Sequence, residues 1–290
     1  MFMSRELRCG LVLEGGAMRG MYTAGVLDTF MESGITMDSV VGVSAGALFG
    51  VNFLSGQKGR AIRYNKKYNR DPHYLGVLPL LKEGNIVSTE YAYHRVPCEL
   101  DPFDNETFQK ADAEFYAVIT NMITGEAEYV RITDIFKQMD TLRASGSMPY
   151  VSTPVIINGT PYMDGAVTDN IPFEWMSTQN VDRMVVVLTR DISYKKRAMS
   201  KLLTNGMYRK KYPKFAASLI KRHLRYAGQI ADLRKLEEEG KIFVIRPSRP
   251  IRMSRIERKP EKLQEAYDLG CKDAKDCMNK LKSYLAGDEN

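Results

Sequence analysis

Residues 40–48, Val40-Val41-Gly42-Val43-Ser44-Ala45-Gly46-Ala47-Leu48, form a run of small and apolar residues that contains one polar side chain, Ser44. Its β-branched residues predict a strand that ends at Gly42, and its last residues predict the start of a helix. A serine between them fits a sharp strand–turn–helix elbow, whose neighbours two positions away must be almost without side chains. Gly42 and Gly46 meet that requirement. Ser44 is therefore the candidate nucleophile, although an ordinary turn can carry the same five-residue pattern.

A second candidate site lies one strand earlier. Residues 9–13 predict a short buried strand, and Glu14-Gly15-Gly16-Ala17-Met18-Arg19-Gly20 then leads into a helix expected over about residues 21–33, which ends at Gly34. Such a turn can bind an anion through its backbone N–H groups. A dinucleotide fingerprint would need glycine at position 17 and an acidic residue ending the next strand, but Asp38 precedes that strand. A phosphate loop would need Gly-Lys-Ser/Thr. We therefore favour an oxyanion hole that faces Ser44.

A third group of residues supplies a carboxylate. Asn158-Gly159 predicts a hairpin turn, and the returning strand carries Asp164 to a bend at Gly165. An Asp-Gly pair is also a common turn without chemistry. The position of Asp164 after a strand and before Asn170-Ile171-Pro172 makes it the candidate base.

Taken in order, Gly15-Gly16-x-x-Arg19-Gly20, Gly42-x-Ser44-x-Gly46 and Asp164-Gly165-Ala166 resemble the motifs of the patatin-like phospholipase family. The resemblance extends to residues 144–149 and to Asp169-Asn170-x-Pro172, and it covers roughly residues 9–190. It implies a three-layer α/β/α fold with a mostly parallel central sheet, as in bacterial patatin-like serine acyl hydrolases. It further implies Ser44 as nucleophile, Asp164 as base and no metal or cofactor. The implied oxyanion hole comprises Gly15, Gly16, Ala17 and Arg19, and Gly20, Gly42, Gly46 and Gly165 are the remaining motif glycines. The family usually has a third glycine where Ala17 stands.

The resemblance implies a lipase-like or phospholipase-like esterase that cleaves lipid acyl esters through a Ser-Asp dyad. One alternative is an acyltransferase that uses the same serine, and another is a noncatalytic membrane-binding regulatory protein. A triad of Ser44, Asp164 and His223 would follow the chain order of α/β-hydrolases. His223, however, lies among Lys and Arg residues that would depress its basicity. The other histidines, His73 and His94, precede Asp164 in loop-like sequence.

Charge divides the chain into two parts. Residues 191–290 hold 25 Lys and Arg against 13 Asp and Glu, whereas residues 1–190 hold 17 against 22. We predict a catalytic domain over 1–190 and a basic C-terminal extension over 191–290, packed on it, with one more strand at 241–246 and a terminal helix at 261–285. An amphipathic helix over 215–226 either packs on the body or contacts an anionic membrane. Nucleic acid is not expected, because no binding module accompanies the charge.

Several other features bound the class of protein. No run of eighteen apolar residues is present, and the first eight residues lack the apolar core of a signal peptide. Four cysteines without zinc-like spacing predict reduced thiols. These features predict a cytoplasmic location or one at the membrane periphery. Residues 56–84 predict a solvated helix and loop, residues 86–112 carry no clear pattern, and residues 132–143 predict a helix.

Overall fold

A central sheet of eight strands organises the chain, and the computed structural model describes it over residues 7–287. The strand order is β5-β6-β3-β2-β1-β7-β8, with β4 paired to β3. The strands from β3 through β2, β1 and β7 to β8 are parallel, and β4, β5 and β6 add antiparallel pairings at one edge. The strand bounds are β1 (Cys9–Leu13), β2 (Ser39–Val43), β3 (Glu114–Asn121), β4 (Ala127–Ile132), β5 (Val155–Ile157), β6 (Thr160–Asp164), β7 (Arg183–Val187) and β8 (Phe243–Ile245).

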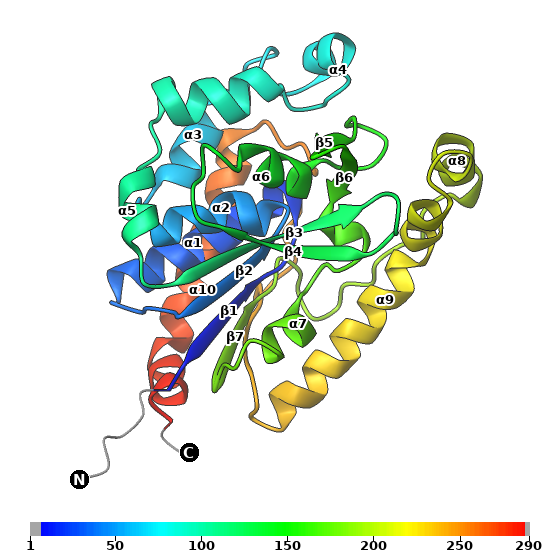
Figure 1. The fold of residues 1–290 in the computed structure, drawn as a ribbon. Helices are drawn as coiled ribbons and strands as arrows, with labels where there is room; N and C mark the ends of the chain where they lie inside the picture. The colour runs from blue at the N-terminus through cyan, green and yellow to red at the C-terminus, as the bar shows by residue number, and fades with distance from the viewer. Residues whose placement is uncertain (1–6, 288–290) are drawn as a thin grey trace.

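Helices cover both faces of this sheet (Figure 1). One face packs against α1 (Gly20–Glu32), α2 (Ala45–Leu54) and α10 (Pro260–Ala286), and the other against α7 (Phe173–Ser177) and α9 (Pro213–Glu238). The predicted three-layer α/β/α fold with a mostly parallel sheet is confirmed. The other helices are η1 (Ala17–Arg19), α3 (Arg60–Tyr68), α4 (Val77–Glu83), the π-helix η2 (Glu90–Leu100), α5 (Asn105–Lys110), α6 (Met139–Gly146), η3 (Gly165–Val167), α8 (Lys201–Thr204) and η4 (Asn205–Arg209).

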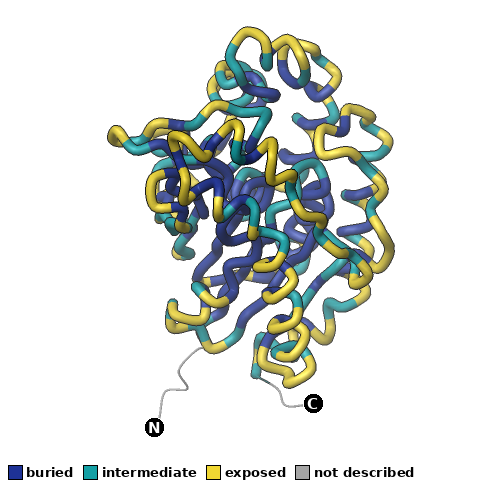
Figure 2. The backbone as a smooth tube through the Cα atoms, turned by 90° about the vertical axis from the view of Figure 1, so that its right-hand side faces the viewer, coloured by how far each residue is buried: buried dark blue, intermediate teal, exposed yellow. Residues whose placement is uncertain are grey.

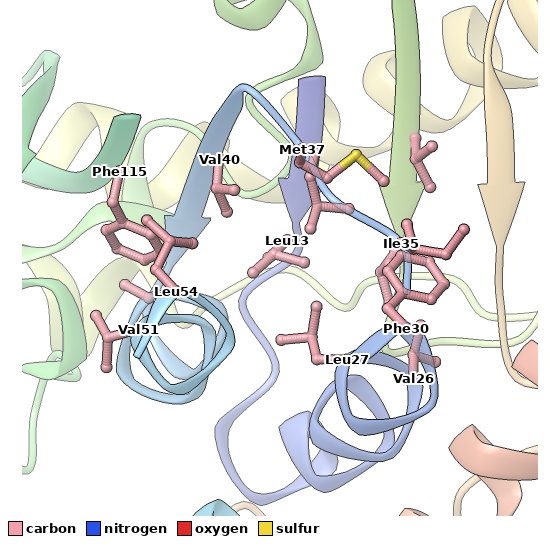
Figure 3. Close-up of a cluster of buried hydrophobic side chains, with 14 of the residues drawn as sticks. Leu13, Val26, Leu27, Phe30, Ile35, Met37, Val40, Val51, Leu54 and Phe115 are labelled. Carbon is pink, nitrogen blue, oxygen red and sulfur yellow. The ribbon is translucent and has the colours of Figure 1, made fainter. Parts of the chain in front are cut away.

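The core follows from the alternation of side chains along the buried strands. In β1, Leu11 and Leu13 point to the layer of α1, α2 and α10, while Val12 points to the layer of α7 and α9. Figure 3 shows Leu13 facing Leu27 of α1, beside Phe30. Buried residues accordingly lie at the centre of the molecule, and exposed residues lie at its periphery (Figure 2). Both faces of the central strands β1, β2 and β7 are therefore covered, and the ends of these strands are the places left for a site.

Two sequence-based expectations for the middle of the chain are wrong. The helix expected over residues 132–143 begins only at Met139, because side chains hold the preceding residues in a turn. The carboxylate of Asp134 accepts the N–H groups of Phe136 and Lys137, and the Gln138 amide oxygen accepts those of Thr133 and Asp134. Such side-chain bonds to nearby backbone compete with helix formation.

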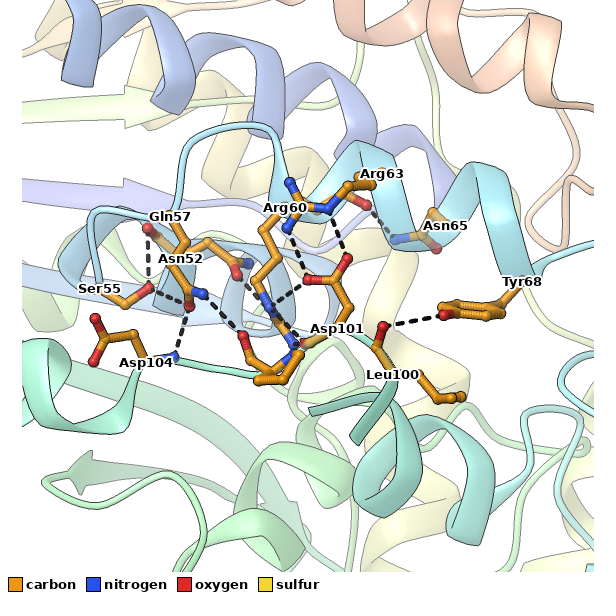
Figure 4. A network of polar contacts seen from close by, with 12 residues as sticks. Asn52, Ser55, Gln57, Arg60, Arg63, Asn65, Tyr68, Leu100, Asp101 and Asp104 are labelled. Carbon is orange, nitrogen blue, oxygen red and sulfur yellow. Dashed lines mark hydrogen bonds and ion pairs between the residues drawn. The ribbon is translucent and has the colours of Figure 1, made fainter. Parts of the chain in front are cut away.

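The segment expected to be solvated, residues 56–84, is partly buried. Arg60 is 4% exposed, and Tyr68 and Tyr74 are also buried. The Arg60 guanidinium donates to the Asp101 carbonyl oxygen and to Asn52 Oδ1, and Arg63 pairs with the Asp101 carboxylate through two contacts of 2.8 Å (Figure 4). These bonds tie α3 to the residues after η2, a region whose sequence has no clear pattern. The two segments together form one wall of the site.

The C-terminal third is joined to the sheet and to its helical layer. Strand β8 extends the sheet beside β7, and α10 crosses α1 at a pair of glycines. Helix α9 is longer than the expected 215–226, and its apolar residues Phe215 and Leu219 are fully buried, whereas Leu224 is 64% exposed. The apolar stripe thus packs on the body. No helix within residues 7–287 is long and apolar enough to cross a membrane. The domain boundary at residue 190 and the cellular compartment stay predictions.

Candidate active site

Ser44 occupies the predicted elbow between β2 and α2. Its backbone has φ 54° and ψ −120°, a conformation that non-glycine residues rarely adopt. A Cβ on Gly46 would lie 2.4 Å from the Leu13 carbonyl oxygen, and one on Gly42 would lie 2.6 Å from the Ala47 nitrogen. Both glycines are therefore required by contact. The turn leaves Ser44 at the N-terminus of α2, where developing negative charge is favoured.

Asp164, at the end of β6, lies beside that serine. The Ser44 hydroxyl donates to Asp164 Oδ2 at 3.0 Å, and Asp164 Oδ1 accepts the Ala166 N–H at 2.8 Å. Burial raises the pKa of Asp164 above its usual value, while the Ala166 N–H, the Arg222 guanidinium, the Ser44 hydroxyl and the Lys196 ammonium oppose that rise. The structure thus brings the two sequence-predicted residues into hydrogen-bond contact, with the carboxylate oriented by a second bond.

The glycine-rich turn lies close to Ser44, because a Cβ on Gly15 would be 3.3 Å from the Ser44 Cβ. The Gly15 N–H donates to the Asn170 carbonyl at 3.4 Å, and the Arg19 N–H donates to the Gly16 carbonyl at 3.2 Å. Among the hydrogen bonds of residues 7–287, the Gly16 and Ala17 N–H groups have no acceptor. Ala17 adopts φ 49°, so alanine takes the left-handed conformation that a third glycine would adopt without strain. Of the four residues predicted for an oxyanion hole, Gly16 and Ala17 are therefore the two whose backbone N–H groups are free to bind an oxyanion.

Glu14 holds this turn in place, a role that sequence reasoning missed. Its carboxylate is buried and accepts bonds from the Asn170 amide at 2.9 Å and from the Thr189 N–H and hydroxyl at 2.6 and 3.0 Å. These bonds join the ends of β1 and β7 to the segment that follows Asp164. A charged residue directly after five buried strand residues was the available signal, because a buried carboxylate needs several donors.

Ser145 is the second residue that was missed. Its hydroxyl accepts the Ser44 N–H at 2.9 Å and donates to the Val118 carbonyl at 2.7 Å. Ser145 thereby fixes the strained elbow to β3. It lies in the 144–149 segment that carries part of the family resemblance, but nothing in the sequence assigns it a partner.

Two cavities meet at Ser44. One is mainly apolar, and its lining includes Leu48, Phe49, Tyr74, Val96, Phe103 and Leu142. The other is polar, and its lining includes Asp164, the Gly15–Ala17 turn and several cations. Ser44, Ala17, Met148 and Arg255 line both. A molecule that reaches Ser44 can therefore extend in two chemically different directions.

The histidines are not part of this arrangement. His223 lines neither cavity, and its Nδ1 lies 3.0 Å from the Ile220 carbonyl of its own helix. His73 and His94 are exposed. Across residues 7–287, no group of three or more His, Cys, Asp or Glu side chains is placed to hold a metal.

Comparisons with known proteins agree with the motifs. A family model described as patatin-like phospholipase matches residues 11–175, and one described as a domain of unknown function (DUF6363) matches residues 212–286. An Escherichia coli protein named uncharacterized protein YjjU is 29% identical over 63% of this chain and 52% of its own length. The lysophospholipase nte1 of Emericella nidulans is 28% identical over 60% of this chain and 11% of its own length.

Two further matches also cover only part of the matched protein. An uncharacterized NTE family protein of Mycobacterium bovis is 26% identical over 61% of this chain and 30% of its own length. Among solved structures, VipD from Legionella pneumophila aligns over 95% of this chain and 67% of its own, with a TM-score of 0.47 and 14% identity. The matched region thus spans about half or less of these curated relatives.

Proposed function

Because the chain belongs to the patatin-like phospholipase family, we propose that it hydrolyses acyl esters of lipids, with Ser44 as nucleophile and Asp164 as base. The observation that carries this proposal is the 3.0 Å contact between Ser44 Oγ and Asp164 Oδ2, at the junction of two cavities. The named lysophospholipase among the relatives supports the same class, a carboxylic ester hydrolase.

Acylation begins with attack of Ser44 Oγ on the ester carbonyl carbon, as its proton passes to Asp164 Oδ2. The raised pKa of Asp164 brings the carboxylate closer to the basicity that this transfer requires. The tetrahedral intermediate then collapses, the C–O bond to the alcohol breaks, and the proton on Asp164 goes to the departing oxygen. The products of this half-reaction are the free alcohol and acyl-Ser44.

The carbonyl oxygen becomes negative during this step, and the Gly16 and Ala17 N–H groups are the donors proposed to stabilise it. Each such donor contributes about 3 kcal/mol to stabilisation of the transition state. Arg19 adds positive potential and anchors the turn, because its Nη1 donates to the Met253 carbonyl at 3.2 Å.

Deacylation repeats the chemistry with water. Asp164 accepts a proton from the water that attacks acyl-Ser44, and then returns it to Ser44 Oγ as the acid leaves. The apolar cavity receives the acyl chain in both half-reactions, because its walls offer Leu48, Phe49 and Leu142. An acyltransferase would differ only in admitting an alcohol instead of water.

Access to lipid is proposed to occur at the end of the molecule that carries α4 and α8, which flank β5 and β6 in Figure 1. Leu81 of α4 is 77% exposed and Leu202 of α8 is 87% exposed. Each helix begins two residues after a residue that lines a cavity: α4 follows Leu75 of the apolar cavity, and α8 follows Met199 of the polar one. A peripheral membrane contact would thus involve these short helices, since the apolar stripe of α9 packs inward.

The test is hydrolysis of p-nitrophenyl esters of short and long acyl chains by purified protein. We expect Ser44→Ala and Asp164→Ala to lose activity by several orders of magnitude, and long chains to be preferred. His223→Ala is the matched control, because it also removes a titratable group but lines neither cavity. An inert wild-type protein would contradict the hydrolase, and loss of activity in His223→Ala would contradict the dyad.

A further inference from the structure

The polar cavity beside Ser44 is surrounded by cations. Its lining includes Arg19, Arg190, Lys196, Arg222 and Arg255, against two carboxylates, Glu14 and Asp164. Within residues 7–287, none of the five cations lies within 4.0 Å of a carboxylate oxygen as an ion pair. Five basic side chains thus converge on one space, and none of them has a carboxylate within ion-pair distance among the described residues.

The two carboxylates offset only part of this charge, because they are two groups against five, and their oxygens already accept bonds from other partners. Glu14 is already engaged by donors from Asn170 and Thr189, and Asp164 is bonded to Ser44. Two arginines retain unused donors: the Nε atoms of Arg19 and Arg222 are buried and have no acceptor among the described residues. Arg19 as a whole is only 6% exposed. Buried guanidinium groups with unused N–H donors are costly unless an acceptor fills the space.

Mutual repulsion among these cations points the same way. Burial, followed by the nearby charges of Arg190 and Arg255, lowers the pKa of Arg19 to about 10. The pKa of Lys196 is lowered by burial and then by the charge of Arg222. A bound anion would relieve both the desolvation and the repulsion.

We propose that this cavity binds the phosphate group of the substrate, so that the preferred substrates are acyl esters of a phosphorylated alcohol, such as a lysophospholipid with an anionic headgroup. The inference rests on the proposed function and names the substrate class of the same site. Ser44 lies on the boundary of both cavities, so an acyl chain in the apolar one places the alcohol part among the cations. Arginine matches phosphate geometry through paired donors.

The C-terminal third supplies most of this subsite. Arg222 lies on α9 and Arg255 lies in the segment before α10, both within residues 212–286 that match the domain of unknown function. Lys196 precedes α8, and its ammonium lies 4.1 Å from the centroid of the ring of Tyr226, which lies on α9 like Arg222. The role assigned to this region is to complete the active site with the groups that recognise the headgroup.

Two esters that differ only in the phosphate provide the test. We would compare kcat/KM for 1-oleoylglycerol and for 1-oleoylglycerol 3-phosphate at monomeric concentrations, by the oleate released. The wild-type ratio should favour the phosphorylated ester by tenfold or more, and Arg222→Gln should reduce that ratio by about tenfold, the effect of one charge-assisted hydrogen bond. The ratio is used because the charge of Arg222 also lowers the pKa of Asp164. A change in the proposed base alters kcat/KM for both substrates by the same factor and leaves the ratio unchanged.

Lys221→Gln is the matched control, since it removes one positive charge at the adjacent, exposed position of α9. It should leave both rate constants and their ratio unchanged. Arg255→Gln is a second test variant at an exposed residue, so its folding is not at risk. An unchanged ratio in both Arg222→Gln and Arg255→Gln would overturn the proposal.

Binding separates this inference from the proposed hydrolysis. Calorimetric titration of Ser44→Ala protein with the same two lipids should show tighter binding of the phosphorylated one, even if the wild type proves inert. Inert wild type with this preference would contradict the hydrolase and keep the phosphate subsite. Inorganic phosphate is the third titrant: if it binds while the two lipids bind equally well, the cavity takes a free anion and the headgroup proposal is wrong.

Discussion

The crossing of α1 and α10 can be tested with a single methyl group. A Cβ on Gly270 would lie 2.1 Å from the Tyr22 carbonyl oxygen, and one on Gly25 would lie 2.1 Å from the Tyr267 carbonyl oxygen. Both contacts are with backbone, so no side-chain rotation can relieve them. Gly270→Ala must therefore move one helix by about 1 Å, and α10 holds α1 directly after the glycine-rich turn of the site.

The expected cost follows from two opposing effects. Overpacking of this kind costs about 1–3 kcal/mol, and a rigid backbone obstacle places Gly270→Ala at the upper end. The higher helix propensity of alanine than of glycine stabilises the folded state by about 1 kcal/mol, which offsets part of this cost. The net loss is about 2 kcal/mol in the free energy of unfolding, which corresponds to a fall in Tm of about 5 °C for a chain of this size.

The assay is thermal and urea unfolding followed by circular dichroism. Gly228→Ala is the control: it makes the same substitution within α9, at a position where a Cβ meets nothing within 4 Å. It should raise stability by up to about 1 kcal/mol through helix propensity alone. Opposite signs for the two variants support the close crossing, whereas equal stabilisation by both would refute it.

Three further results are expected at the site, and one at its rim. As the proposed base, Asp164 must be ionised, so kcat/KM should fall at low pH with a midpoint above the usual aspartate pKa of about 4, and Arg222→Gln should shift that limb to higher pH. Asp164→Asn should abolish activity yet unfold at higher temperature than wild type at pH 8, because ionising a carboxyl of raised pKa destabilises the folded state; the difference should close as pH falls toward 4. Ser145→Ala should cost about 2 kcal/mol of stability and lower kcat, since the buried Ser44 N–H loses its acceptor, as paired unfolding and rate measurements would reveal. Leu202→Asp should weaken cosedimentation with lipid vesicles while leaving hydrolysis of dissolved esters unaffected.

The parts of the site that the sequence predicted are those set by local geometry. Gly42 and Gly46 must be glycine because backbone atoms occupy the space of their side chains, and the five-residue pattern around Ser44 already indicates both positions. The Asn158-Gly159 turn likewise fixes the register that delivers Asp164 beside β3. Both predictions were possible from short local patterns, although the contact of Gly46 with Leu13 is seen only in the tertiary structure.

The parts that could not be predicted depend on partners far away in the chain. Arg60 was expected in solvent because it lies in a polar segment, but Asp101 and Asn52 satisfy its donors inside the wall of the apolar cavity. Ser145 acquires its role only when the helix that ends beside it meets the elbow, 101 residues earlier. The sequence shows which chemical group each side chain carries. Which partner that group contacts depends on the tertiary structure.

The basic C-terminal third shows how far net charge can be interpreted. Residues 191–290 hold 25 Lys and Arg against 13 Asp and Glu, and this excess of positive charge predicts attraction to an anion. It does not say which surface of the protein binds the anion. Lys221 and Arg222 are adjacent, yet successive residues of a helix point about 100° apart, and only Arg222 lines the cavity beside Ser44. Lys196 and Arg255 reach the same cavity from segments on either side of α9 in the sequence. If these cations bind the headgroup, substitutions in this third can change the preferred lipid while the dyad and its elbow stay intact.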